Sequence, residues 1–352
     1  EWERLADLHS INFSRGILIL ARRALEISTT QALAGEIDFD DQLYMPACFR
    51  ANLDKYKLVL VDEAQDLSEI QHFLISRTVG TGGRFISVGD PNQAIYGFRG
   101  ALSDSMPALA ARFNSRRLSL TQSFRCSKAA VKLAQVYVPR IEAFPTNPIG
   151  SVTRLGLAWN PAELEPGSSV LCRNIAPLVK LGMQCIKAGV PAYVVGKDIG
   201  APLLKAVKNL PIAPSLVKAI LQWQEGEIAK SRGNLEIISR TNDTTDALLA
   251  VVDQGTANNV TALANTLKEL FSRSSGSIVL STIHRAKGLE WSTVYFLDSW
   301  RVPQKWILKA VKESPDAAWM LEQEKNLFYI AVTRTKDKLI FIDYEDKNDK
   351  QH

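Results

Sequence analysis

Cysteine and histidine are scarce in this chain, and long apolar runs are missing. Four cysteines and four histidines occur among 352 residues, and no Cys-x-x-Cys pair is present. Such a composition argues against a structural zinc site. No apolar stretch approaches the roughly 18 residues that span a bilayer, and no secretory signal is visible. These gaps predict a reduced, cytoplasmic protein without a membrane span.

Apolar residues are plentiful enough to build real cores. They make up 46% of the 352 residues, and a chain of this length usually forms two or three domains. The net charge of +5 favours polyanionic partners only mildly, because the excess is spread along the sequence.

Hydrophobic periodicity divides the chain into an N-terminal helical region and two α/β regions. Residues 1–50 carry an apolar stripe at helical spacing, while residues 58–120 alternate short apolar strands with helices. This alternation is typical of a parallel sheet. In that region we predict strands at 58–61 and 84–88.

A second α/β unit is expected from residue 118, interrupted by a helical insertion at 199–276. Its predicted strands are 169–172, 192–195, 277–280, 293–297 and 339–342, and its predicted helices are 127–138 and 176–188. The expected segments are therefore 1–117, 118–198, 199–276 and 277–352.

Two adjacent carboxylates, Asp62 and Glu63, end the first apolar strand. Four unbroken aliphatic residues at 58–61 predict a strand buried on both faces, and parallel sheets bind ligands at the carboxyl ends of their strands. Phosphoryl transfer to water needs an acid that holds Mg²⁺ and a second group that orients the water. We assign Asp62 to the metal and Glu63 to the metal and the water. Carboxylates merely solvated at a strand end are the competing interpretation.

A polar loop follows the second strand and reads Gly-Asp-Pro-Asn-Gln-Ala-Ile-Tyr-Gly-Phe-Arg-Gly-Ala at 89–101. Because it leaves the same sheet as Asp62, Gln93 is expected near a terminal phosphate or its water. Tyr96, Phe98 and Arg99 combine aromatic faces with a cation, which is suited to stacking unpaired bases. Ordinary packing explains the rings equally well.

The run Asp-Glu-Ala-Gln-Asp at 62–66 and the loop at 89–101 resemble the second and third motifs of superfamily 1 DNA helicases of the UvrD/Rep/PcrA type. Three more runs continue in the family's order. Leu-Thr-Gln-Ser-Phe-Arg-Cys-Ser at 120–127 is similar to the fourth motif, Ser-Thr-Ile-His-Arg-Ala-Lys-Gly-Leu-Glu-Trp at 281–291 to the fifth, and residues 324–334 to the sixth.

The resemblance implies an ATP cycle that uses Mg²⁺. Arg125 would contact the γ-phosphate, Arg334 would act as an arginine finger, and Gly288 and Glu290 would lie near the nucleotide. Two arginines from a second domain stabilise phosphoryl charge only on domain closure, which couples hydrolysis to movement. An arginine such as Arg334 is also common on an ordinary helix face.

The resemblance also implies contact with DNA. Thr282 and His284 of the fifth motif would join Tyr96, Phe98 and Arg99 at a single strand. Taken alone, His284 is more often an ordinary surface or core histidine.

One motif of the family is missing from these residues. No Gly-x-x-x-x-Gly-Lys-Ser/Thr run, which cradles phosphates in such ATPases, occurs in the sequence. The first residue is Glu1, and only 61 residues precede Asp62. We therefore expect an N-terminally truncated chain whose first lobe has an unpaired strand edge and an exposed apolar face, and which has little or no ATPase activity alone.

The predicted fold is α/β, with two RecA-like parallel-sheet lobes of the P-loop NTPase type. The first lobe is expected to be incomplete, and the second to contain a small helical insertion of undefined role. The resemblance implies an ATP-dependent helicase that moves 3′ to 5′ on single-stranded DNA and contacts duplex junctions. Whether it serves DNA repair, DNA replication or phage biology stays open. Two alternatives stay open: a degenerate, non-catalytic nucleic-acid-binding protein, and the motor subunit of a helicase–nuclease complex.

Overall fold

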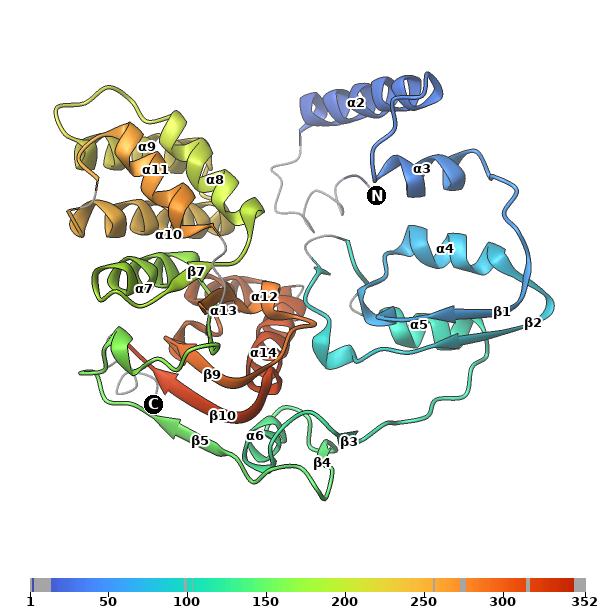
Figure 1. Cartoon of the computed structure of the whole chain (residues 1–352). Helices are drawn as coiled ribbons and strands as arrows, with labels where there is room; N and C mark the ends of the chain where they lie inside the picture. Colours follow the sequence, from blue (N-terminus) through green and yellow to red (C-terminus); the bar gives the residue numbers. More distant parts are fainter. Residues whose placement is uncertain are drawn as a thin grey trace. The chain divides into compact units, whose positions relative to one another are not determined.

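A computed structural model describes residue 2 and residues 14–97, 100–102, 104–255, 257–272, 277–314 and 317–344. Contacts divide the chain into an N-terminal unit, Glu1–Ser119, and a C-terminal unit, Leu120–His352. The predicted boundary lay after residue 117. Figure 1 shows the elements of each unit.

The N-terminal unit begins with the predicted helical region. Helix α2 spans Arg15–Leu33 and α3 spans Asp41–Cys48. The Ser14 Oγ accepts a hydrogen bond from the Ile17 amide at 3.2 Å and caps α2, and Gly35 follows the helix with a left-handed φ of 96°. The apolar stripe of α2 is largely exposed, since Leu20 is 70% accessible and Ala32 is the one residue of the helix that is fully buried.

Two parallel strands, β1 (Tyr56–Val61) and β2 (Val79–Ser87), form the sheet of this unit and confirm the two predicted strands. The remaining elements are η1 (Ala64–Asp66), α4 (Glu69–Thr78), η2 (Pro91–Gln93) and α5 (Ser105–Arg112). Strand β2 begins earlier than predicted, and its Gly83 has no room for a side chain because a Cβ there would lie 2.9 Å from the Tyr56 carbonyl oxygen.

The prediction that β1 is buried on both faces is wrong. Leu58 and Leu60 are 42% and 67% exposed, because β1 has only β2 as a hydrogen-bonded neighbour among the described strands. Ile86 on β2 and the following Val88 are also exposed. The expected exposed apolar face is therefore confirmed.

The C-terminal unit is built on a six-stranded, fully parallel sheet in the order β5-β10-β9-β6-β8-β7. Its strands are β5 (Ser151–Arg154), β6 (Ser169–Cys172), β7 (Ala192–Val194), β8 (Ile278–Thr282), β9 (Trp291–Leu297) and β10 (Thr335–Ile342). Five of these were predicted. Strand β5 and the small parallel pair β3 (Gln122–Ser123) and β4 (Glu142–Ala143) were not.

The helices and turns around this sheet are α6 (Lys128–Ala134), η4 (Pro161–Glu163), α7 (Ile175–Lys187), α12 (Ile283–Ala286), η5 (Ser299–Arg301), α13 (Lys305–Glu313) and α14 (Ala318–Thr333). Helix α6 ends earlier than the predicted residue 138. Pro139 follows that residue and disfavours helical backbone before it.

The stretch predicted as a helical insertion consists of helices joined by short connections in its described part. It contains α8 (Lys197–Lys208), α9 (Leu216–Lys230), α10 (Leu235–Asp253) and α11 (Val260–Leu270). Leu248 of α10 and Leu263 of α11 belong to the same buried cluster as Leu178 of α7. The carboxylate of Asp243 in α10 accepts hydrogen bonds from the Ile175 and Ala176 amides at 2.9 and 3.0 Å, so the insertion caps α7 of the sheet lobe.

None of the described helices is both long enough and apolar enough to cross a membrane.

Candidate functional site

The carboxylates of Asp62 and Glu63 lie at the carboxyl end of β1 and are both exposed. Glu63 adopts a left-handed φ of 50°, which is uncommon for a residue with a side chain and makes a sharp turn at the strand end. Its amide donates to Asp62 Oδ1 at 2.8 Å. The turn therefore presents both acids to solvent beside each other.

Gln65 connects this turn to the loop after β2. Its side chain is 2% exposed; its Nε2 donates to Glu63 Oε2 at 2.5 Å, and its Oε1 accepts from the Asp90 amide at 3.0 Å. Gly89 makes room for this amide, because a Cβ there would lie 2.3 Å from Gln65 Oε1. Glu63 and the loop that carries Gln93 are thus held by one buried side chain.

Asp90 orients Gln93. Its Oδ2 accepts from Gln93 Nε2 at 3.0 Å, while its Oδ1 accepts from the amide and the side chain of Asn92, both at 3.0 Å. From the sequence, residues 89–101 were predicted as a polar loop, and Asp90 and Gln65 were not predicted as supporting residues. The aspartate before Pro-Asn was the available signal, since Asp favours capping such turns.

The acid pair suits Mg²⁺ by the nature of its donors. Proteins commonly bind this ion through one or two carboxylates, with water and substrate phosphates completing the shell. Within the described ranges, no group of three or more His, Cys, Asp and Glu side chains is arranged as a metal cage. Two carboxylates of this kind could hold an ion whose remaining ligands are water and phosphate oxygens.

Three predicted residues of the C-terminal unit converge at the amino ends of β9 and β10. Those ends are neighbours, because β9 and β10 are parallel with Trp291 opposite Thr335. Glu290 precedes β9 and Arg334 precedes β10. Arg125 arrives from the loop after β3 and places its Nε 2.5 Å from Glu290 Oε2.

A further cation, Lys336, shares Glu290. Its Nζ lies 2.6 Å from Glu290 Oε1. Hydrogen bonding from Lys336 and the nearby charge of Arg125 hold the pKa of Glu290 below its ordinary value. Lys336 was not among the predicted site residues; its place at the start of β10, two residues after Arg334, was the available signal.

Arg334 is buried, with 1% of its surface accessible. Its guanidinium donates to the carbonyl oxygens of Ile330 and Leu289 and to Thr333 Oγ1, each at 3.3 Å. Burial, followed by repulsion from Arg125, lowers the pKa of Arg334 to about 10. In this structure, backbone oxygens bind the residue predicted as a finger.

The turn between α12 and β9 requires a left-handed φ of 83° at residue 288, which glycine adopts without strain. That turn sets the place of Glu290.

The predicted DNA contacts divide between the two units. Thr282 ends β8 and His284 lies in α12, where Ile283 and Ala286 are buried and His284 is half-buried. Tyr96 is half-buried in the N-terminal unit. Phe98 and Arg99 lie outside the described residues.

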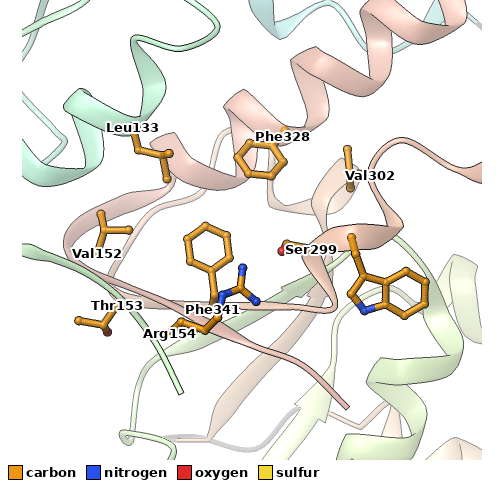
Figure 2. Close-up of a pocket in the computed structure, with 9 residues that line it drawn as sticks. Leu133, Val152, Thr153, Arg154, Ser299, Val302, Phe328 and Phe341 are labelled. Carbon is orange, nitrogen blue, oxygen red and sulfur yellow. The ribbon is translucent and has the colours of Figure 1, made fainter. Parts of the chain in front are cut away.

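An apolar hollow of about 490 Å³ lies elsewhere in the C-terminal unit (Figure 2). Its lining comes from α6, β5, η5 and the residue after it, α14 and β10: Leu133, Val152, Thr153, Arg154, Ser299, Trp300, Val302, Phe328 and Phe341. Arg154 forms an ion pair with Asp343 and covers the Phe341 ring at 5.0 Å. None of the predicted site residues lines this hollow.

Both units are α/β with parallel sheets. The N-terminal unit has acids at a strand end, and the C-terminal unit has clustered arginines. This is the architecture of RecA-like lobes. Residues 23–114 match the model of the UvrD/REP helicase N-terminal domain, and residues 227–346 match that of the UvrD-like helicase C-terminal domain.

The chain is 27% identical over 317 residues to F-box DNA helicase protein 1 of Schizosaccharomyces pombe, a match that covers 82% of this chain and 34% of that protein. It is 26% identical over 361 residues to ATP-dependent DNA helicase UvrD2 of Mycobacterium tuberculosis, covering 85% of this chain and 50% of the relative. With ATP-dependent DNA helicase Rep of Escherichia coli the identity is 32% over 111 residues, or 29% of this chain and 16% of Rep. The chain belongs to the UvrD/Rep-type superfamily 1 helicases, and it spans half or less of each of these relatives.

Proposed function

We propose that this chain is part of an ATP-driven helicase that moves 3′ to 5′ along single-stranded DNA. The observation that carries the proposal is the convergence of Arg125, Glu290 and Arg334, which lie far apart in the sequence, at the amino ends of β9 and β10. Family membership supports the same activity, because the relatives named above are DNA helicases.

The proposed roles follow from charge and geometry. Mg²⁺ would supply neutralisation of the charge that develops on the phosphates. Asp62 would hold the ion, Glu63 would accept a proton from the attacking water, and Gln93 would orient that water from its position on Asp90. Arg125 and Arg334 would stabilise charge on the transferring phosphoryl group.

Arg125 and Arg334 would have to change partners to act. The pairing of Arg125 with Glu290, and of Arg334 with backbone carbonyls, holds both cations on the protein. A phosphate would compete with Glu290 for Arg125, while Lys336 would keep the displaced Glu290 carboxylate neutralised.

For DNA, we propose that Tyr96, Thr282 and His284 contact the strand, together with Phe98 and Arg99. Aromatic stacking on bases and a cation near the backbone provide sequence-tolerant binding. Anisotropy of a labelled oligo(dT) tests this. His284→Ala together with Thr282→Val should weaken binding several-fold, whereas Lys187→Ala, which changes a surface lysine at the end of α7, should affect it only slightly.

Turnover is tested through Glu63. These 352 residues contain no Gly-x-x-x-x-Gly-Lys-Ser/Thr run, and we propose that they hydrolyse little ATP by themselves. Joined to a segment that contains such a loop, they should show DNA-stimulated ATPase activity. Glu63→Gln should then retain ATP binding and reduce turnover at least 100-fold, in line with the loss of a general base. Unchanged turnover would contradict the assignment, and rapid hydrolysis by the chain alone would contradict the proposed inactivity.

A further inference from the structure

Asn147 connects the two backbone carbonyls that flank the Arg125 loop. Its Nδ2 donates to the Ser123 carbonyl oxygen at 2.7 Å and to the Cys126 carbonyl oxygen at 2.8 Å. One amide group has two N–H donors, so both are used on this loop. Arg125 lies between the two bound carbonyls.

The loop also contacts the end of α14 and the 142–150 segment, which carries Asn147. The Cys126 thiol donates to the Thr333 carbonyl oxygen at 3.4 Å, which ties the loop to the end of α14 beside Arg334. The Phe144 amide donates to the Ser123 carbonyl oxygen at 3.0 Å, and the rings of Phe124 and Phe144 lie 4.4 Å apart. Apart from the bond of the Cys126 thiol, these contacts come from the 142–150 segment, which therefore supports the loop.

Close packing extends to Gly150 at the end of this segment. A Cβ on Gly150 would lie 2.3 Å from both the Asp337 carbonyl oxygen and Ser127 Cβ. Ser127 is the N-cap of α6 and follows the loop directly. The Lys128 and Ala129 amides donate to the Pro148 and Ile149 carbonyl oxygens at 2.9 and 3.0 Å. Contacts of Phe144, before Asn147, and of residues 148–150, after it, thus fix the distance between the segment and the loop.

Arg125 needs such support because its own side chain is 39% exposed and long. Holding a flexible guanidinium in one place costs side-chain entropy, and a backbone that moves would add to that cost. Groups that act in chemistry work only within a narrow range of positions, which supporting hydrogen bonds maintain.

We propose that Asn147 is a positioning residue for Arg125. It holds the loop where the Arg125 guanidinium reaches Glu290 at the amino ends of β9 and β10. The role of Arg125 toward phosphate rests on the proposed function. The placement of Arg125 by Asn147 does not depend on it.

The carboxyl group of Glu290 reports where Arg125 is. Arg125 and Lys336 both contact it, with Arg334 and Cys126 nearby. The measurement is a carbon-13 NMR titration of the Glu290 carboxyl in the full chain. The variants are Asn147→Ala, Asn147→Asp and Arg125→Ala, with Asn160→Ala as the matched control. Asn160 caps η4, where its Oδ1 accepts a bond from the Ala162 amide at 2.9 Å.

We expect Arg125→Ala to raise the pKa of Glu290 part of the way to its ordinary value, because Lys336 stays in place. Asn147→Ala should raise it in the same direction, and the double variant should go no higher than Arg125→Ala alone. Asn147→Asp should act like Asn147→Ala or more strongly, since a carboxylate cannot donate to two carbonyls. Asn160→Ala should titrate like the wild type.

A Glu290 that titrates normally in Asn147→Ala, or that does not respond to Arg125→Ala, would overturn the proposal. Failure of both Asn147 variants to fold while Asn160→Ala folds would also overturn it, since the amide would then hold the lobe and not the arginine. Failure of the proposed function looks different: Glu290 would shift as expected, while Arg125→Ala would leave ATP turnover unchanged in the loop-containing polypeptide.

Discussion

The two units contain similar apolar strands in very different surroundings. Strand β1 of the N-terminal unit is mostly exposed, whereas every residue of β6 in the C-terminal unit is buried. Strand β6 lies between β8 and β9 and β1 has only β2 beside it among the described strands. An aliphatic run therefore determines a strand, while the number of neighbouring elements determines its burial.

The supporting contacts at the candidate sites do not differ in the same way. In the N-terminal unit Gln65 is 2% exposed and links two loops. In the C-terminal unit Asn147 links two carbonyls around Arg125. Both sites rest on amide side chains that contact backbone or acid groups, although one sheet is covered and the other is not.

The largest difference between the two units is expected from a matched pair of leucine-to-alanine substitutions. Leu171 in β6 is 0% exposed and Leu60 in β1 is 67% exposed. Leu171→Ala should lower the free energy of unfolding of the C-terminal unit by about 2–5 kcal/mol, because it leaves a cavity. Leu60→Ala should change stability by only about 0.5 kcal/mol. Urea unfolding followed by hydrogen exchange of each unit measures both, and equal losses would contradict the contrast.

A substitution at Gly89 tests whether the N-terminal unit is tightly packed around Gln65, although its sheet is exposed. A Cβ there would lie 2.3 Å from Gln65 Oε1 and 3.1 Å from the Ala64 amide. We expect Gly89→Ala to destabilise the N-terminal unit by about 1–3 kcal/mol through overpacking. Gly233→Ala, which has a left-handed φ but no atom within 4 Å of the new Cβ, should cost about 1 kcal/mol in its own unit. Thermal unfolding of each variant decides whether the loop can relax.

Asp243 tests how firmly the helical insertion supports the sheet lobe. Asp243→Ala removes the cap of α7 and should cost about 0.5–2 kcal/mol, whereas Asp243→Asn keeps an acceptor oxygen and should cost less. Burial raises the pKa of Asp243.

The folded state therefore binds the proton of the Asp243 carboxyl group more tightly than the unfolded state does. The stabilisation that comes from this protonation is fully present below the ordinary aspartate pKa and is lost as pH rises through the raised pKa of the folded state. Asp243→Asn should flatten that part of the stability profile. Urea unfolding at a series of pH values measures it, with Asp253→Asn at the exposed end of α10 as the control.

The smallest effect on stability is expected on the apolar face of the N-terminal unit, here Leu58, Leu60, Ile86 and Val88. Leu60→Glu together with Ile86→Glu should leave the unfolding of the C-terminal unit unchanged and reduce binding of a hydrophobic dye. Undiminished dye binding would show that another surface, such as the exposed stripe of α2, is responsible.

Much of this arrangement was predictable from local sequence. The runs at 58–61 and 169–172 are strands, the 199–276 stretch is helical where described, and the alternation of strands and helices indicated parallel sheets. Strand β5 was missed because Ser151–Arg154 has little apolar alternation and is held by pairing with β10. The helix predicted over 127–138 was too long, because residues 135–137 form a turn and Pro139 disfavours helical backbone at residue 138.

The sequence by itself determined the acid pair at a strand end, the order of the motifs and the kind of fold, because these depend on neighbouring residues and their periodicity. Only the tertiary structure decided that Leu60 is exposed, that Arg334 is buried, that Arg125 and Lys336 both pair with Glu290, and that Asn147 donates to the carbonyls on either side of Arg125. Those contacts join residues far apart in the chain, and parallel strand pairing and packing bring them together.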